Sequence, residues 1–232
     1  MAEGLGKEVV SRLQATPLFA GLAEADVRAL AAGASVVSLA DQHPLYDSGA
    51  PLENLYVVLD GHVELSIEID GRRVVVEVAR RGMVLGDAAL FAGRQTLMAA
   101  RVLTGATLLA IPAEPFAARL EERFDVLLHM LSVMSLRLRT LVRQIAELKL
   151  KTTAQRLGSF LLSFSDAASG RAEIRFPYDK RLVAEELGMK PESLSRALAK
   201  LARLGVESRP DNLVVVADIG RLRQFCVEDD LG

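Results

Sequence analysis

The chain contains a single cysteine, Cys226, among its 232 residues. One thiol cannot close a disulfide within the chain, and it cannot supply the several ligands of a Cys-rich zinc site or an iron–sulfur cluster. We therefore expect Cys226 to be a small, packed apolar side chain.

Long apolar runs are also missing, although 50% of the residues are hydrophobic. No stretch approaches the roughly 20 apolar residues of a membrane-spanning helix, and the start of the chain lacks the charged and then apolar pattern of a signal peptide. The sequence predicts a globular protein of the cytoplasm that has no membrane partner.

Neither sign of charge is in large excess, because the net charge is −2. A protein that coats nucleic acid indiscriminately is therefore not expected, and DNA binding would require a local basic patch. The motifs GxSxG, Walker A and HExxH and a Gly-rich dinucleotide turn are absent, and the three histidines lie far apart in the sequence. We predict no catalytic residues and no enzyme activity.

The first half of the chain has the pattern of short strands after a helical stretch at 22–34. Asp60-Gly61 and Asp70-Gly71 accept the positive φ of tight hairpins, so the strands around them should pair antiparallel. Residues 62–69 alternate between apolar and polar, which is typical of a half-buried strand. The candidate strands are 55–59, 62–69, 73–79, 83–85, 98–103 and 107–111. Together they predict an all-β unit over about 34–111 that closes as a sandwich or small barrel.

From Pro115 onward the apolar spacing alternates between four and three residues, which is the pattern of one long helix with a coiled-coil seam. The seam positions are Leu127, Leu131, Met134, Leu138, Leu141, Ile145 and Leu148. A straight helix would let this stripe drift over three heptads, so the strict repeat favours a second long helix as the partner. The chain offers none, which predicts a parallel homodimer. The alternative is a helix that lies along its own β-domain.

Two short helices meet at Gly188, the first over 181–187 and the second beginning at Pro191. Leu194, Leu198, Leu201 and Leu204 form the inward stripe of the second helix. A strand at 172–177 precedes the pair, and two strands about a Pro-Asp-Asn turn follow it. This order predicts a winged helix-turn-helix.

Glu192, Ser195 and Arg196 share one face near the start of the second helix, where a recognition helix reads base edges. Arg196 can donate to guanine O6 and N7, Glu192 can accept from cytosine N4, and Ser195 can bond a base or a phosphate. Four cations flank this face as candidate phosphate ligands: Lys180, Lys190, Lys200 and Arg209. The alternative is a Glu–Arg pair on an ordinary amphipathic helix.

Several stretches together resemble the CRP/FNR family of bacterial transcription factors over nearly the whole chain. They are "TPLFAGLAEADVRALA", "LYVVLDGHVEL", "GMVLGDAALFAG" and "FPYDKRLVAEELGMKPESLSRALAKLARLGV". The resemblance implies an α+β fold with a cyclic-nucleotide-binding-like β-roll (a double-stranded β-helix or jelly roll) over 1–114, a dimerisation helix over 115–150 and a winged helix-turn-helix over 151–232.

The resemblance also implies a target and partners. Glu192, Ser195 and Arg196 match the Glu-x-x-Ser-Arg pattern of the FNR-like branch, which is associated with TTGAT-type palindromes in double-stranded DNA. RNA polymerase would be a further partner of an activator. The stretch "YDKRLVAEELGMKPESLSRA" is most similar to regulators of denitrification and of the nitric oxide response.

The signal is harder to read from the sequence. The family's cyclic-nucleotide pocket has Gly-Glu and then an Arg that pairs the phosphate, whereas this chain has Gly86-Asp87 and offers Thr96-Leu97-Met98 where the Arg would stand. Cyclic AMP is therefore not expected unless Arg94 or Arg101 takes over. We take Gly86, Asp87, Arg94 and Thr96 as candidate effector residues.

The family's iron–sulfur type needs an N-terminal cysteine cluster, which this chain lacks. Haem stays open as a cofactor for a nitric oxide sensor, with His43, His62 or His129 as axial ligand. A second function also stays open, a cyclic-nucleotide- or other small-ligand-binding module with a different output. That module would need the phosphate-binding Arg and would have no use for the reading face.

Overall fold

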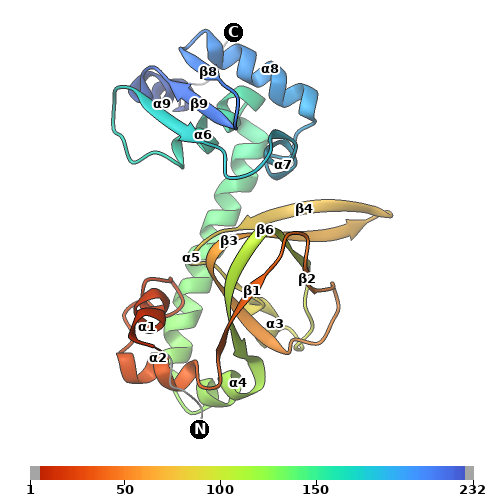
Figure 1. Ribbon diagram of the computed structural model, residues 1–232, viewed down its shortest axis with the longest axis vertical. Coiled ribbons are helices and arrows are strands. Elements are labelled where there is room, and N and C mark those ends of the chain that lie inside the picture. The colour runs from red at the N-terminus through yellow and green to blue at the C-terminus, as the bar shows by residue number, and fades with distance from the viewer. Residues whose placement is uncertain (1–5, 228–232) are drawn as a thin grey trace. The chain divides into compact units, whose positions relative to one another are not determined.

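The computed structural model describes residues 6–227, and within the long helix it leaves out the side chains of Arg137, Gln144, Glu147, Leu148 and Lys149. The chain divides into two compact units, the first ending at Leu138 and the second beginning at Arg139. Figure 1 shows the elements of each unit. In the described part of the chain, no helix is both long and apolar enough to span a bilayer.

The first unit is an antiparallel β-roll with helices at its ends. Its strands are β1 (Ser35–Leu39), β2 (Pro44–Tyr46), β3 (Asn54–Ile69), β4 (Arg72–Ala79), β5 (Val84–Leu85) and β6 (Ala99–Pro112), and its complete helices are α1 (Lys7–Gln14), α2 (Glu24–Leu30), α3 (Asp87–Phe91) and α4 (Ala113–Glu121). The order in the sheet is β1-β6-β3-β4, with β2 on β6 and β5 on β3.

Alternate side chains along β3 contribute to two different apolar clusters. Leu55, Val57 and Leu59 face the cluster that includes residues of α1, α2 and α4. Val58 and Val63 face the interior of the roll. The strand predicted over 62–69 is confirmed as part of β3, but its two faces do not divide as predicted, because Glu64 and Ser66 are buried and Ile69 is 50% exposed.

The hairpin predicted at Asp60-Gly61 is wrong, because β3 runs through both residues as one strand. Gly61 has a φ of +83°, and a Cβ there would lie 2.6 Å from the carbonyl oxygen of Gly105 on β6. The pairing of β3 with β6 shifts register at this point. The missing side chain of Gly61 therefore allows a close approach of two backbones. The strands predicted at 98–103 and 107–111 are one strand, β6. The hairpin at Asp70-Gly71 is confirmed, since it joins β3 to β4.

The helix predicted from Pro115 is two helices, α4 and α5 (Phe124–Leu150). Arg123 lies at the break and pairs with Asp26 of α2 and with Asp125, whose carboxylate is 2.8 Å from Arg123 Nη2. The guanidinium holds the pKa of Asp125 at about 2, while the two carboxylates raise the pKa of Arg123. These ion pairs link the start of α5 to α2, which the apolar spacing alone did not indicate.

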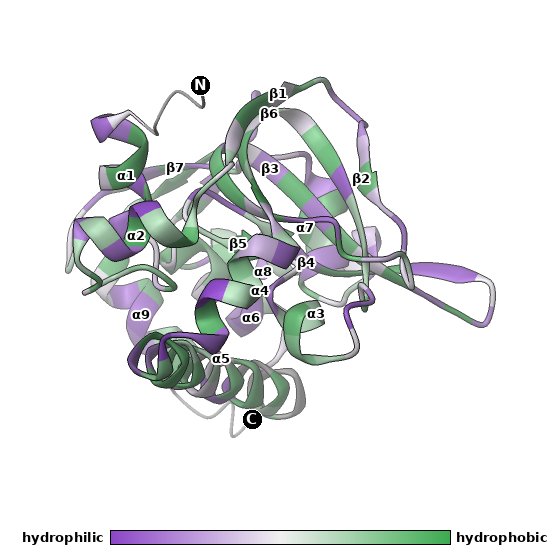
Figure 2. Cartoon of the chain, turned by 90° about the horizontal axis from the view of Figure 1, so that it is seen from below, coloured by the Kyte–Doolittle hydropathy of each residue, from purple (hydrophilic) through white to green (hydrophobic). Residues whose placement is uncertain are grey.

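The long helix α5 packs on its own unit at its start and leaves much of the predicted seam exposed. Val126 and Met130 are buried in the core of the first unit, so the start of α5 does lie along its own β-domain. Of the predicted seam, Leu131, Leu138 and Ile145 are 59%, 62% and 54% exposed, and Leu141 is exposed as well. Leu127 and Met134 are partly buried, and the side chain of Leu148 lies outside the description. Figure 2 shows hydrophobic residues recurring along α5.

The second unit contains the remainder of the chain. Its helices after α5 are α6 (Thr153–Leu162), α7 (Lys180–Glu186), α8 (Pro191–Ala202) and α9 (Ile219–Val227), and its strands are β7 (Ala172–Arg175), β8 (Val206–Ser208) and β9 (Leu213–Val216). The antiparallel sheet has the order β7-β9-β8. Cys226 is buried, as predicted, with its sulfur 2.5 Å from where a Cβ on Gly158 would lie. Two helices followed by the β8–β9 hairpin form the predicted winged helix-turn-helix.

Candidate nucleic-acid interface

The sequence ends α7 and starts α8 with local signals. The side chain of Asp179 caps α7 by accepting a hydrogen bond of 2.9 Å from the N–H of Leu182. Gly188 has a φ of +60°, which turns the chain after α7. Pro191 occupies the first turn of α8, where its missing N–H leaves no bond unmade.

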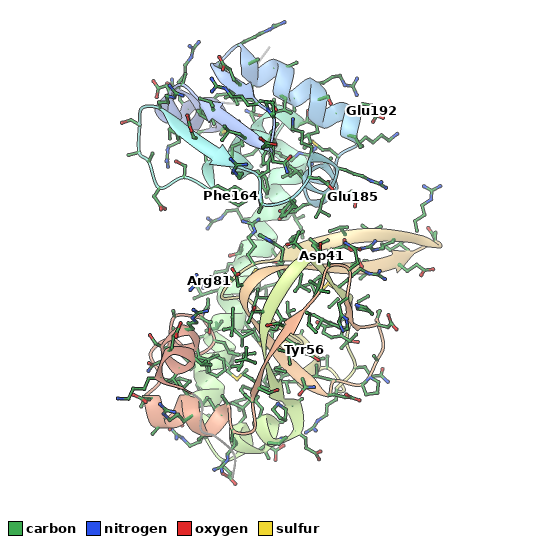
Figure 3. The ribbon with its side chains drawn as sticks, viewed as in Figure 1. Asp41, Tyr56, Arg81, Phe164, Glu185 and Glu192 are labelled. Carbon is green, nitrogen blue, oxygen red and sulfur yellow. The ribbon has the colours of Figure 1, made fainter. Side chains whose placement is uncertain are left out.

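One face of α8 packs into the core of the unit. Leu194, Ala197 and Leu201 are buried, and Leu198 and Leu204 are partly buried. Burial of this stripe holds the helix, so the opposite face projects outward without contributing to the core. Figure 3 marks Glu192 at the start of α8.

The three predicted reading residues are exposed. The hydroxyl of Ser195 donates to the carbonyl of Pro191 at 3.1 Å, and Arg196 donates to the hydroxyl of Ser193 at 3.3 Å. No residue in the described part of the chain pairs with the carboxylate of Glu192. Since exposed local bonds of this kind contribute little, all three side chains are available to a partner.

The four predicted phosphate ligands have different surroundings. Lys190 is exposed at the N-cap of α8. Lys180 donates to the hydroxyl of Ser208 on β8 at 2.8 Å, and Arg209 pairs with Glu207 at 3.1 Å. The structure thus brings Lys180 to the hairpin that carries Arg209. Lys200 lies 5.8 Å from the centre of the Phe225 ring.

The hairpin between β8 and β9 is the wing. Asp211 and Asn212 both have positive φ, near 57°, which suits a tight hairpin turn. The N–H of Arg209 donates to the carbonyl of Leu213 at 2.7 Å, and Arg175 donates to the carbonyl of Asp211 at 2.7 Å. These bonds fix the tip beside β7.

Sequence reasoning missed a pocket of about 330 Å³ between α6 and α8. Its lining residues are Thr153, Ala154, Ser193, Arg196, Ala197 and Lys200. Thr152 and Gln155 form a capping box at the start of α6, so the pattern Thr-x-x-Gln marks the start of this helix in the sequence but not the pocket. A helix N-terminus beside two cations makes an electropositive hollow that suits a phosphate.

The predicted effector residues lie on the loop from β5 to β6, which contains α3. Gly86, with a φ of +86°, precedes α3, and Asp87 begins it. Arg94 is exposed. Thr96 is buried, and its hydroxyl bonds the carbonyls of Asp47 and Ala50 at 2.6 and 3.2 Å. The hydroxyl of Thr96 is therefore engaged in holding the loop.

The three histidines have different environments. His43 is exposed. The pKa of His62 is lowered by partial burial and then by the charge of Arg80, against which Asp60 acts weakly. The Nε2 atom of His129 is buried and has no hydrogen-bond partner among the described residues. Groups of three or more His, Cys, Asp or Glu that would hold a metal ion do not occur within the described residues.

A helix with one buried face and one exposed polar face, next to a wing, is the arrangement of a winged helix-turn-helix, which is typical of DNA-binding transcription regulators. Two family models match the chain, the cyclic nucleotide-binding domain over residues 36–123 and the Crp-like helix-turn-helix domain over residues 155–225. The chain belongs to the CRP/FNR family.

Relatives match over most of their length. The CRP-like cAMP-activated global transcriptional regulator of Mycobacterium tuberculosis is 21% identical over 210 residues, which cover 88% of this chain and 94% of the relative. The structure of a Ruegeria pomeroyi protein classed as cyclic nucleotide binding is 32% identical, with a TM-score of 0.71 and coverage of 95% and 97%. FixK2 of Bradyrhizobium japonicum, at 23% identity, shares the fold with a TM-score of 0.71 and coverage of 82% and 96%.

Proposed function

We propose that the chain is a homodimeric transcription regulator that reads a TTGAT-type palindrome through α8. The observation that carries this proposal is the exposed face of Glu192, Ser195 and Arg196 on a helix whose other face is buried. A regulator of this kind acts on chromosomal DNA in the cytoplasm. RNA polymerase is its further partner if the output is activation.

The proposed half-site fits the chemistry of α8. TTGAT holds one G·C pair, whose guanine suits the guanidinium of Arg196 and whose cytosine suits the carboxylate of Glu192. Lys180, Lys190, Lys200 and Arg209 are the proposed phosphate ligands, and Lys200 lines the pocket beside α6. A palindrome requires two copies of α8 about one DNA turn apart.

The exposed apolar stripe of α5 supports the dimer. Leu131, Leu138, Leu141 and Ile145 follow a spacing of seven, three and four residues, so they lie on one side of the helix. A single chain leaves these side chains in water, and a second copy of α5 would cover them. We propose residues 115–150 as the dimerisation segment between a sensor at 1–114 and the DNA-binding domain at 151–232.

For the signal we propose nitric oxide, sensed through haem, with His129 as the iron ligand. The buried Nε2 of His129, which has no protein partner in the described chain, favours this residue over His43 and His62. A neutral imidazole nitrogen is a ligand for haem iron. Cyclic AMP, which activates the Mycobacterium tuberculosis relative, is not the proposed signal, because Thr96 stands in the loop where the phosphate-binding Arg is expected.

A fluorescence anisotropy titration tests the DNA proposal. We expect the chain to bind a TTGAT palindrome roughly 10³-fold more tightly than a duplex of the same composition in scrambled order. Equal affinity for the two duplexes would contradict sequence reading by α8.

Absorption spectroscopy tests the signal separately. We expect haem to bind with saturation in a ratio of one per chain, and His129→Ala to change the Soret band while His43→Ala leaves it unchanged. Identical titrations of the parent chain and the His129→Ala variant would contradict the proposed ligand.

A further inference from the structure

The first turn of α6 contacts two other helices of the DNA-binding unit. The side-chain amide of Gln155, which is buried, donates to the carbonyl of Phe225 on α9 at 3.3 Å. The guanidinium of Arg156 donates to the carbonyl of Leu187 at 2.8 Å. One turn of helix thus braces α9 and the turn between α7 and α8.

The carbonyl of Leu187 stands at the end of α7, directly before Gly188. Helix ends leave their last carbonyls without partners in the helix and carry a partial negative charge. The N–H of Gly188 bonds the carbonyl of Glu185 at 3.0 Å, and that of Met189 bonds the carbonyl of Ala184 at 2.9 Å. Arg156 supplies a charged donor from another element, which closes the turn from outside.

The guanidinium of Arg156 is held in one position. Its Nε atom is buried without a partner among the described residues, so the side chain is held by packing and by the bond to Leu187. Thr153 and Ala154, in the same turn of α6, line the pocket opposite Ser193 and Ala197 of α8. The end of α7 and the start of α8 therefore both lie against this turn of α6.

We propose that Arg156 is a positioning residue for DNA reading, which holds the turn between α7 and α8 and so sets the direction in which α8 presents Glu192, Ser195 and Arg196. This inference rests on the proposed function for its consequence, but the holding of the turn is a property of the protein without DNA. The two parts are therefore tested separately.

Hydrogen exchange on the full chain without DNA tests the holding. In Arg156→Ala we expect the amides of Gly188 and Met189 to exchange at least about tenfold faster, while those of Val214 and Val216 on β9 keep their rates. Arg156→Lys retains a charged donor and should show a smaller acceleration. Arg171→Ala, which removes an exposed arginine of the same unit, is the control and should change neither set.

Two exchange results would overturn the proposal. Unchanged amides at Gly188 and Met189 would show that the bond does not hold the turn. Equal acceleration of exchange on β9 would show that Arg156 supports the unit as a whole. If Arg156→Ala does not fold, the same comparison of exchange rates is made with Arg156→Lys.

Anisotropy titrations with the TTGAT palindrome and the scrambled duplex test the consequence. We expect Arg156→Ala to lose about 10- to 100-fold in affinity for the palindrome and less than about twofold for the scrambled duplex, with an unchanged salt dependence on the scrambled duplex. A salt slope reduced by about one would identify Arg156 as a phosphate ligand and overturn the positioning role. Unchanged affinity for the palindrome would overturn it as well.

A parent chain that does not distinguish the two duplexes would contradict the proposed function. In that case the exchange of Gly188 and Met189 still decides whether Arg156 holds the turn.

Discussion

The loop of α3 and the helix α8 use their predicted site residues in opposite ways. In the loop, the hydroxyl of Thr96 is buried and bonded to the carbonyls of Asp47 and Ala50. On α8, Arg196 is exposed, and among the described residues it bonds only Ser193, three residues away. The side chain of Thr96 thus stabilises its own unit, whereas the side chain of Arg196 is available to a partner.

This difference affects which properties of the family can be inferred for this chain. The proposed reading face consists of three side chains that match the family pattern residue by residue. The candidate effector loop has the family's glycine at Gly86 but differs at the residues that would meet a cyclic phosphate. The residues of the chain therefore indicate how it binds DNA more clearly than they indicate which signal controls it.

The largest expected effect lies on α5, which belongs to both units. Replacing Leu138 and Leu141 with Glu should give monomers and lower affinity for the palindrome by at least about 10³-fold, because two charges enter the apolar seam. Sedimentation equilibrium and anisotropy measure the two effects. Leu136→Glu, about 160° around the helix from Leu138, is the control and should leave dimers. Dimers of the doubly substituted chain would contradict the seam.

The next effect concerns α8 alone. Arg196→Ala should weaken binding to the palindrome by about 1–3 kcal/mol and relax the choice at one base pair, because a bidentate contact to guanine is lost. Titration against single-pair variants of the palindrome measures both. Arg221→Ala, in an exposed position on α9, is the matched control. Unchanged discrimination in Arg196→Ala would place another face of the unit toward DNA.

The corresponding change in the β-roll should affect stability instead. Thr96→Val should lower the free energy of unfolding of the first unit by about 1 kcal/mol, because the buried hydroxyl no longer bonds two carbonyls. Thr104→Val, in an exposed position, should have little effect. Urea unfolding followed in the first unit measures the loss, and intact stability in Thr96→Val would show that its hydroxyl is not structural.

The smallest effect is a pH dependence in the β-roll. Because the pKa of His62 is lowered in the folded protein, its contribution to stability is complete above the unfolded pKa of about 6.5 and is lost as the pH falls through the folded value. The free energy of unfolding should thus fall less in His62→Gln than in the parent chain between about pH 7.5 and 5.5. Parallel pH profiles of the two chains would contradict this assignment.

Local patterns predicted most of the fold. Alternation gave the strand over 62–69, and Gly188 with Pro191 gave the boundary between α7 and α8. Contacts between distant residues accounted for the errors. Asp60-Gly61 has the composition of a hairpin turn, but its glycine permits a close approach to Gly105, 44 positions away by residue number.

Local patterns predicted only part of the candidate nucleic-acid interface, for the same reason. The exposed face of α8 follows from helical spacing, which the sequence contains. The pocket beside α6 and the bond from Arg156 to Leu187 join elements that are separate in the chain, so no local pattern revealed them. The break before α5 likewise lies where Arg123 pairs with Asp26, which is distant in the chain.

Selection of duplexes from a randomised DNA library by the full chain, followed by sequencing, measures directly which sequence the protein reads. We expect enrichment of an inverted repeat of TTGAT-type half-sites whose centres lie about one DNA turn, or roughly 10 base pairs, apart. Enrichment of a single unrepeated site, or of no sequence, would contradict a dimer that reads DNA through two copies of α8.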